Sequence, residues 1–299
     1  MTTSPTDPPA GLDLRPLHAD DKLLGGLPVP PADQDLRRWR RSVIAAAHGQ
    51  VVGVGWISLA PVTDTYFVEV HVDDGHRRRG IGTALFKALC ARADEPFPVC
   101  ARVMSSQPWR REFATSLGCT VRIHYPGPWI DPTSEPARAW AKQQPLPPGY
   151  SIRSMAEVEL ERVIDAWATY YDWVHRPFGS VWPERVRDQW DSYANGLDPQ
   201  LSMITADEAG TVVAFSLVTP DAWQGRTFVV SETVDPEQPD GEALLIATVA
   251  ASVRAMGCVG IRAVELEGHS TDPHSPALAR SLPPNGGDPM DIVELTRSS

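Results

Sequence analysis

Apolar and polar residues alternate in one part of the first half of the chain and then recur at helical spacing. Over residues 65–72, apolar Val68, Val70 and Val72 alternate with polar residues, so one face of a strand is expected to be buried. Over residues 81–90, apolar residues recur at i, i+4, i+7 and i+8, which predicts an amphipathic helix. The pattern predicts a strand, a turn and a helix in succession.

The same order of segments occurs twice along the chain. Gly11 begins a stretch that resembles the one from Gly149, and the strand ending near Val72 corresponds to one ending near Val234. The offset grows from 138 to 162 residues, so the second copy carries 162 − 138 = 24 additional residues between its first two strands. A repeat of this length indicates duplicated domains rather than a solenoid.

A proline-rich stretch separates the two copies, beginning at about residue 131. Proline removes backbone donors from helices and sheets, so this stretch is interpreted as a linker. We expect a first domain over residues 1–145, which includes the linker, and a second over residues 146–299. Each copy predicts an α+β fold, with a mixed and mostly antiparallel sheet flanked by helices. The helix predicted within residues 242–256 is apolar nearly all round, and we expect it to be more deeply buried than its counterpart.

The composition is typical of a globular protein, with 42% hydrophobic and 22% charged residues. No membrane-length apolar run and no secretory leader is apparent, so we expect a cytoplasmic protein that does not bind membranes. The excess of arginine over lysine, with abundant alanine and proline, indicates a GC-rich bacterial genome, and we expect a monomer or homodimer. The four cysteines form no C-x-x-C pair, and no metal is expected. Residues 1–148 carry a net charge of +2 and residues 149–299 carry −13, which argues against nucleic acid as a partner.

Three arginines precede a Gly-x-Gly turn at the start of the first helix. A helix N-terminus offers unpaired N–H groups, glycine admits a ligand close to the backbone, and arginine suits phosphate. The turn therefore predicts a cradle for pyrophosphate. The P-loop pattern is absent, and Leu85 occupies the third glycine position of the Rossmann fingerprint. The plain alternative is a solvated arginine turn that caps an ordinary helix. The residues of the turn are Arg77, Arg78, Arg79, Gly80, Ile81, Gly82 and Thr83.

Arg77-x-x-Gly80-x-Gly82 after a strand ending Val72-Asp73 resembles the GNAT superfamily of acyl-CoA-dependent N-acetyltransferases. The resemblance implies that the turn holds the pyrophosphate of acetyl-CoA. The resemblance is strong over residues 11–130, whereas the second copy shares with the family only the order of its strands, turns and helices. There Glu242 aligns with Gly80 and Leu244 with Gly82, so the second copy is predicted to be degenerate. The plan is similar to that of the mycothiol synthases, tandem members in which the C-terminal copy is the working one.

The resemblance implies a catalytic first domain. The thioester would lie in a gap between splayed strands, beside Val70 and Val72, where a backbone N–H polarises its carbonyl. Glu69 is the candidate base, with His71 as the alternative, directly or through a water. Each also has a structural interpretation, as a solvated strand carboxylate or a structural histidine. The family's usual acid tyrosine is replaced by Ala114, so Tyr125 or a water is the candidate proton donor.

Aromatic residues are dense between Trp167 and Trp190, in the segment that is longer in the second copy. Tyr171 and Trp173 are candidate contacts for an acceptor, although a core between helices, together with the contact between the two copies, is the favoured explanation for these aromatics. The acidic second half favours a small, cationic amine bound between the domains. The predicted function is transfer of an acetyl group from acetyl-CoA to this amine. The alternative is a non-catalytic acyl-CoA-binding module whose second domain serves interaction or scaffold.

Overall fold

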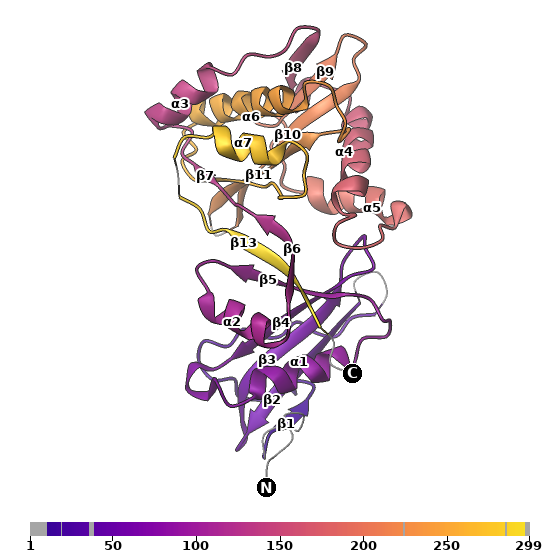
Figure 1. Cartoon of the computed structure of the whole chain (residues 1–299), viewed down its shortest axis with the longest axis vertical. Coiled ribbons are helices and arrows are strands. Elements are labelled where there is room, and N and C mark those ends of the chain that lie inside the picture. The colour runs from indigo at the N-terminus through magenta and orange to yellow at the C-terminus, as the bar shows by residue number, and fades with distance from the viewer. Residues whose placement is uncertain (1–10, 19, 36–38, 224, 285, 297–299) are drawn as a thin grey trace.

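Two β-sheets, each covered by helices, form the two halves of the molecule in a computed structural model (Figure 1). The structure describes residues 11–18, 20–35, 39–223, 225–284 and 286–296. The elements follow the chain twice through the same order, as the repeat predicted. The α+β class is confirmed, because both sheets combine antiparallel neighbours with one parallel pair.

The first sheet has seven strands among the described residues, in the order β1-β2-β3-β4-β5-β13-β6. Helices α1 and α2 pack on one face, where Val68 and Leu85 belong to the same buried core. The strands are β1 (Asp13–Arg15), β2 (Arg40–Ala47), β3 (Gln50–Leu59), β4 (Tyr66–Val72), β5 (Val99–Met104), β6 (Thr120–Tyr125) and β13 (Met290–Leu295), and the helices are α1 (Ile81–Cys90) and α2 (Pro108–Ser116).

The second sheet has the order β7-β12-β11-β10-β9-β8. One face packs against α3, α6 and α7, and the other against α4 and α5. Its strands are β7 (Trp129–Ile130), β8 (Tyr150–Ser154), β9 (Met203–Asp207), β10 (Val212–Trp223), β11 (Arg226–Thr233) and β12 (Val264–Leu266). Its helices are α3 (Glu135–Lys142), α4 (Leu160–Val174), α5 (Pro183–Ala194), α6 (Gly241–Cys258) and α7 (Ser275–Ser281).

The two sheets exchange strands where they meet (Figure 1). β13, at the end of the chain, inserts between β5 and β6 of the first sheet. β7, which follows the first copy, pairs with β12 of the second sheet. The expected boundary at residues 145/146 falls between α3 and β8, but each sheet is completed by a strand from the other side of that boundary.

The proline-rich stretch between the copies is not merely a linker. Ser134 caps α3 by accepting a hydrogen bond from the Ala137 N–H, and proline occupies the first turn, where no hydrogen bond is lost. Ala137 and Trp140 are buried in the core of the second domain, against α6. The linker prediction is therefore wrong for residues 135–142, because proline ends helices but also starts them.

The apolar helix of the second copy is buried as expected. Most side chains of α6 are enclosed, whereas α1 buries one face only. Among the described residues, α6 alone is long and apolar enough to cross a membrane, and its burial against the second sheet is that of a core helix. The 24 additional residues of the second copy include parts of α4 and α5, and no equivalent helix is found between β1 and β2 in the described part of the first copy.

Candidate functional site

The strands β4 and β5 begin as a parallel pair and then separate. Their register joins Tyr66 to Val99 and Phe67 to Cys100, after which β5 continues beside β13. The N–H of Tyr66 donates to Pro98 on the β5 side, whereas the N–H of Asp73 donates to Val52 on the β3 side. Since N–H groups alternate along a strand, those of Val68, Val70 and Val72 face the gap between β4 and β5.

A cleft of ≈ 900 Å³ runs from this gap to the start of α1. Val70, His71 and Val72 line it from β4, and Trp109 and Phe113 line it from α2. Of the predicted turn, Arg79 alone is missing from the described lining residues. The lining includes Arg77, Arg78, Gly80, Ile81, Gly82 and Thr83.

The glycines of the turn have distinct physical tasks. Gly80 caps α1 with φ of 79°, a left-handed conformation that favours glycine. At Gly82, an added Cβ would stand 3.3 Å from the Phe113 ring, so a side chain there presses on the opposite wall. The first intrahelical bond runs from Ala84 to Gly80, so the N–H groups of residues 81–83 have no partner within the helix.

The arginines of the turn are held in position but remain exposed. The Nε of Arg77 donates to the carbonyl of Val72 at 3.2 Å, and its guanidinium forms a 2.6 Å ion pair with Asp74. Arg78 lies 3.4 Å from Glu112 on α2. A positive helix end and exposed guanidinium groups together form an anion site of the predicted kind.

Glu69 and His71 stand together on the face of β4 that points away from α1. Nε2 of His71 lies 3.4 Å from Oε2 of Glu69, and its Nδ1 lies 3.5 Å from Arg110. Trp56 stacks on the imidazole with ring centroids 5.2 Å apart. The His71 contact lowers the pKa of Glu69 despite the opposing effect of burial, so the carboxylate is ionised at neutral pH. Of the predicted pair, His71 lines the cleft, whereas Glu69 is not among the described lining residues and lies next to the cleft through its contact with His71.

Tyr125 lies elsewhere. It is a buried residue at the end of β6, with its ring 5.9 Å from that of His269 in the second domain, and it is not among the described lining residues of the cleft. Burial raises the pKa of its hydroxyl well above the ordinary value. Ala114 faces the apolar core, and Ser116 is the residue that brings a hydroxyl to the cleft from α2.

Tyr171 and Trp173 belong to the aromatic packing around α4. Tyr171 stacks on Trp167 at 4.3 Å, and the indole N–H of Trp173 donates to the carbonyl of Val234 at 2.9 Å. Both are partly buried against the core that α4 and α5 share with the second sheet. Burial, followed by the charge of Glu267, raises the pKa of Tyr171. Both side chains therefore have packing partners within the second domain, Tyr171 with Trp167 and His175 and Trp173 with Val234.

The corresponding cradle of the second copy is filled by its own side chains. α6 begins after Asp240, whose left-handed φ of 58° matches that of Gly80, so the sequence alignment is displaced and Glu242 is the counterpart of Gly82. A Cβ built on Gly241 would lie 2.3 Å from Nε2 of His274. The imidazole therefore occupies the space directly at the start of α6.

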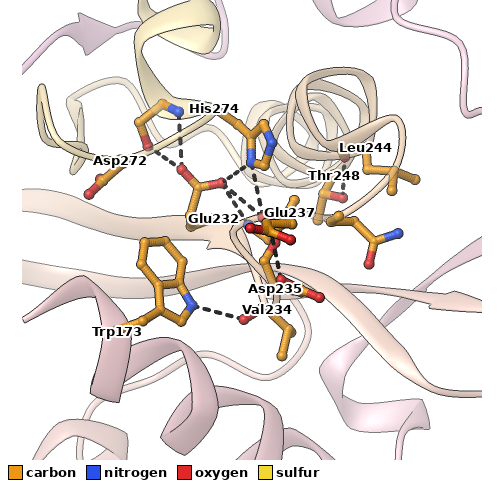
Figure 2. Close-up of polar contacts among 12 residues, drawn as sticks. Trp173, Glu232, Val234, Asp235, Glu237, Leu244, Thr248, Asp272 and His274 are labelled. Carbon is orange, nitrogen blue, oxygen red and sulfur yellow. Dashed lines mark hydrogen bonds and ion pairs between the residues drawn. The ribbon is translucent and has the colours of Figure 1, made fainter.

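A buried carboxylate closes the gap next to this imidazole (Figure 2). Glu232 is fully buried on β11, and its Oε2 accepts 3.0 Å hydrogen bonds from the N–H and hydroxyl of Ser275, at the start of α7. Its Oε1 accepts from the N–H of Thr233 and lies 3.1 Å from Nδ1 of His274. In place of an open cleft, the second copy has a hydrogen-bonded connection between β11 and α7.

Several residues near the site were not predicted from the sequence. Arg110 reaches His71, and Trp109 lies 5.5 Å from the Arg77 guanidinium. Burial lowers the pKa of the Arg102 guanidinium on β5, and the charges of Glu69 and of Glu267, from the second domain, oppose this effect. The "PWRR" segment at the start of α2 could have pointed to Trp109 and Arg110. No local sequence pattern marks Arg102 or Glu267. Within the described part of the chain, no group of three or more His, Cys, Asp or Glu is arranged for a metal ion.

Known proteins resemble both the site-bearing domain and the whole chain. Residues 13–118 match the acetyltransferase (GNAT) family model. A mycothiol acetyltransferase of Clavibacter michiganensis subsp. michiganensis is 25% identical over 215 residues, which cover 71% of this chain and 65% of that protein. This chain therefore matches less than two-thirds of the relative's length.

Two solved structures share the fold. A tandem GNAT protein from the clavulanic acid biosynthesis pathway covers 96% of this chain and 99% of its own, with a TM-score of 0.64 at 18% identity. A GCN5-related N-acetyltransferase from Sphaerobacter thermophilus covers 85% and 79%, with a TM-score of 0.61 at 18% identity. These matches agree with the splayed strands, the Arg-Gly turn and the duplicated order of elements: the chain has a tandem GNAT fold, and its residues 13–118 are a GNAT acetyltransferase domain.

Proposed function

We propose that the protein is an acetyl-CoA-dependent N-acetyltransferase whose first domain binds the coenzyme and catalyses the transfer. The observation that carries this proposal is the contrast between the two copies. The first copy has an open cleft that ends at Gly80–Thr83, whereas His274 and Glu232 fill the equivalent space of the second. Exposed arginines surround the first cradle, and Glu242 stands at the second.

The coenzyme would bind along the cleft in an orientation set by charge. Its pyrophosphate meets the free N–H groups of residues 81–83 and the guanidinium groups of Arg77 and Arg78. The pantetheine arm then follows the gap beside Val72 and Val70. The thioester carbonyl accepts a hydrogen bond from a backbone N–H of β4, which stabilises the oxyanion that forms when an amine attacks.

The amine must lose a proton as it attacks the thioester. Glu69 is ionised and lies beside His71, so it accepts this proton directly or through the imidazole or a water. The new C–N bond forms as the C–S bond breaks, and the coenzyme leaves as a thiolate. Ala114 faces the core, Tyr125 lies outside the cleft lining, and the Ser116 hydroxyl already donates to the carbonyl of Phe113. We therefore assign the thiolate's proton to water.

The acceptor is proposed to be a small amine held between the domains. The face of β4 that carries Glu69 also carries Phe67, and the ring of Phe178 packs 6.4 Å from that of Phe67. Phe178 belongs to the segment after α4, so the second domain covers part of the wall beside the proposed base. The charge of −13 on the second half favours a cationic acceptor through electrostatic steering.

Two measurements test this function. Titration calorimetry with acetyl-CoA is expected to give one site per chain, and release of free thiol with a panel of primary amines is expected to identify acceptors. Two equal coenzyme sites would contradict the assignment to the first domain. Tight binding of acetyl-CoA without thiol release for any amine would instead favour the non-catalytic acyl-CoA-binding module.

A further inference from the structure

An arginine from α2 contacts the imidazole of His71 in the cleft. Arg110 lines the cleft from the first turn of α2, and His71 lines it from β4. The Nη2 atom of Arg110 lies 3.5 Å from Nδ1 of His71. Trp56 on β3 stacks on the same imidazole, with ring centroids 5.2 Å apart. His71 is therefore in contact with side chains from two other elements, β3 and α2.

Arg110 has no carboxylate partner, unlike the charged residues that follow it in α2. Arg111 pairs with Asp291 at 2.7 Å, and Glu112 lies 3.4 Å from Arg78. The Arg110 guanidinium forms no ion pair within 4 Å with any residue that the structure describes. In that part of the chain, the polar contact of its side chain is with His71, so the position of Arg110 and the chemistry of the imidazole are linked.

The contact decides which ring nitrogen of His71 carries the proton. A guanidinium has donors only, so Nδ1 of the neutral imidazole must act as the acceptor and carry no proton. The proton of the neutral ring is then on Nε2. Nε2 is buried, makes no hydrogen bond of ordinary geometry among the described residues, and lies 3.4 Å from Oε2 of Glu69. Since a buried N–H is normally paired, the carboxylate of Glu69 is its acceptor.

We propose that Arg110 is a positioning residue for proton removal and acts on Glu69 through His71. This inference rests on the proposed acetyl transfer. Arg110 occupies the lone pair of Nδ1 and thereby aims the N–H of Nε2 at Glu69, which favours the ionised carboxylate. Because both ring nitrogens are then engaged, the imidazole keeps its proton, and the proton of the amine goes to Glu69 directly or through a water. The Glu69 side chain is 41% exposed, so an amine or a water can reach it.

Nuclear magnetic resonance of isotopically labelled histidine tests the contact without any substrate. Couplings between the ring nitrogens and ring protons show which nitrogen is protonated, and His71→Phe identifies the signals of this residue. At about pH 8, where an ordinary histidine is neutral, we expect the proton of His71 on Nε2. Arg110→Glu replaces the donor by an acceptor and should place a proton on Nδ1, whereas Arg110→Lys should leave the proton on Nε2. A proton on Nδ1 in the unaltered protein, or no change in the Arg110→Glu variant, would overturn the inference.

The pH profile of the reaction tests the effect on the base. The charged groups that act on Glu69 are His71 on its own strand, Arg110 from α2 and Arg102 from β5, and all three lower its pKa against the effect of burial. Arg110→Met should therefore move the acid limb of kcat/KM to higher pH by about 0.5 pH unit, the scale of one charge acting through water. We expect kcat to fall about 10-fold or more as the base loses its orientation. Arg110→Lys should recover most of both losses.

A double substitution separates action through the imidazole from a direct effect of charge. His71→Phe keeps a ring against Trp56 but removes both nitrogens. Adding Arg110→Met to this variant should change kcat and the acid limb little, because the contact is already absent. If the effects of the two substitutions simply add, Arg110 acts on Glu69 by long-range charge alone, and positioning through His71 is wrong.

The controls separate this inference from the proposed function. Arg111→Gln is the matched variant, because this arginine is the next residue of α2 and pairs with Asp291 instead, so the protonation of His71 and the acid limb should not change. Melting temperatures close to that of the unaltered protein show that the variants are folded. Failure of the unaltered protein to bind acetyl-CoA refutes the proposed function, whereas the labelled histidine reports on the contact in either case. Normal kcat and an unmoved acid limb in the Arg110→Met variant overturn the positioning inference alone.

Discussion

At the scale of single residues, the cleft depends on the absence of a side chain at Gly82. Gly82→Asp is expected to lower affinity for acetyl-CoA at least about 100-fold, because the carboxylate repels phosphate and the Cβ approaches Phe113 at 3.3 Å. An acidic residue in the first turn favours the helix itself, so the fold should survive. Titration calorimetry measures the effect. The matched control is Glu242→Gln, the exposed counterpart in the second copy, for which changed coenzyme affinity would argue against a single cradle.

The proposed base gives a second prediction at this scale. Glu69→Gln keeps the shape of the side chain but removes its ability to accept a proton. We expect kcat to fall by about 10²- to 10⁴-fold with little change in affinity for acetyl-CoA. An unchanged kcat would assign proton removal to His71 or water instead.

The contact between His71 and Glu69 has its own signature in the pH profile. His71 is the largest cause of the lowered pKa of Glu69, so the carboxylate stays ionised to lower pH than an ordinary glutamate. His71→Asn should raise the pKa of Glu69 and move the acid limb of kcat/KM to higher pH. The profile of the amine reaction measured with both proteins tests this, and an unmoved acid limb would mean that Glu69 does not control it.

At the scale of elements, β11 and α7 are joined by the buried carboxylate of Glu232 (Figure 2). Glu232→Gln replaces one acceptor oxygen by an NH₂ group that faces donors, and leaving a buried donor unpaired costs about 1–3 kcal/mol. We expect the melting temperature to fall by several degrees, measured by calorimetry, with acetyl-CoA affinity unchanged. Glu237→Gln, at an exposed site nearby, should leave the melting temperature nearly unaltered. Weakened coenzyme binding in the Glu232 variant would imply that the second copy contributes to the coenzyme site.

At the scale of the whole molecule, the exchanged strands make the domains depend on each other. β13 buries Ile292, Val293 and Leu295 in the first sheet, and burial of such side chains is worth about 1.5–3 kcal/mol each. The sum is comparable with the total stability of a small domain. Residues 1–145 alone are therefore expected to aggregate and to bind no acetyl-CoA, whereas co-expression with residues 146–299 should restore a soluble complex that binds it. An isolated first fragment that binds acetyl-CoA normally would contradict this dependence.

The sequence by itself determined what is encoded locally. The alternation at Val68, Val70 and Val72, the helical spacing after Gly80 and the apolar α6 identified elements that the structure confirms. The Arg-Gly turn was recognisable because glycine conformation and helix-end charge depend on neighbouring residues. By contrast, the prolines around the start of α3 led to the wrong prediction of a linker over residues 135–142. Whether a proline starts or ends a helix depends on how the residues after it pack.

Only the tertiary structure decided the relations between distant segments. The exchange of β7 and β13 depends on pairing between residues more than 130 positions apart, for which the periodicity of either segment gives no signal. The same holds for His274 at the start of α6 and for Phe178 packed against Phe67. Their neighbours are supplied by another copy or another strand, so burial and charge at these positions arise only when the two sheets are assembled.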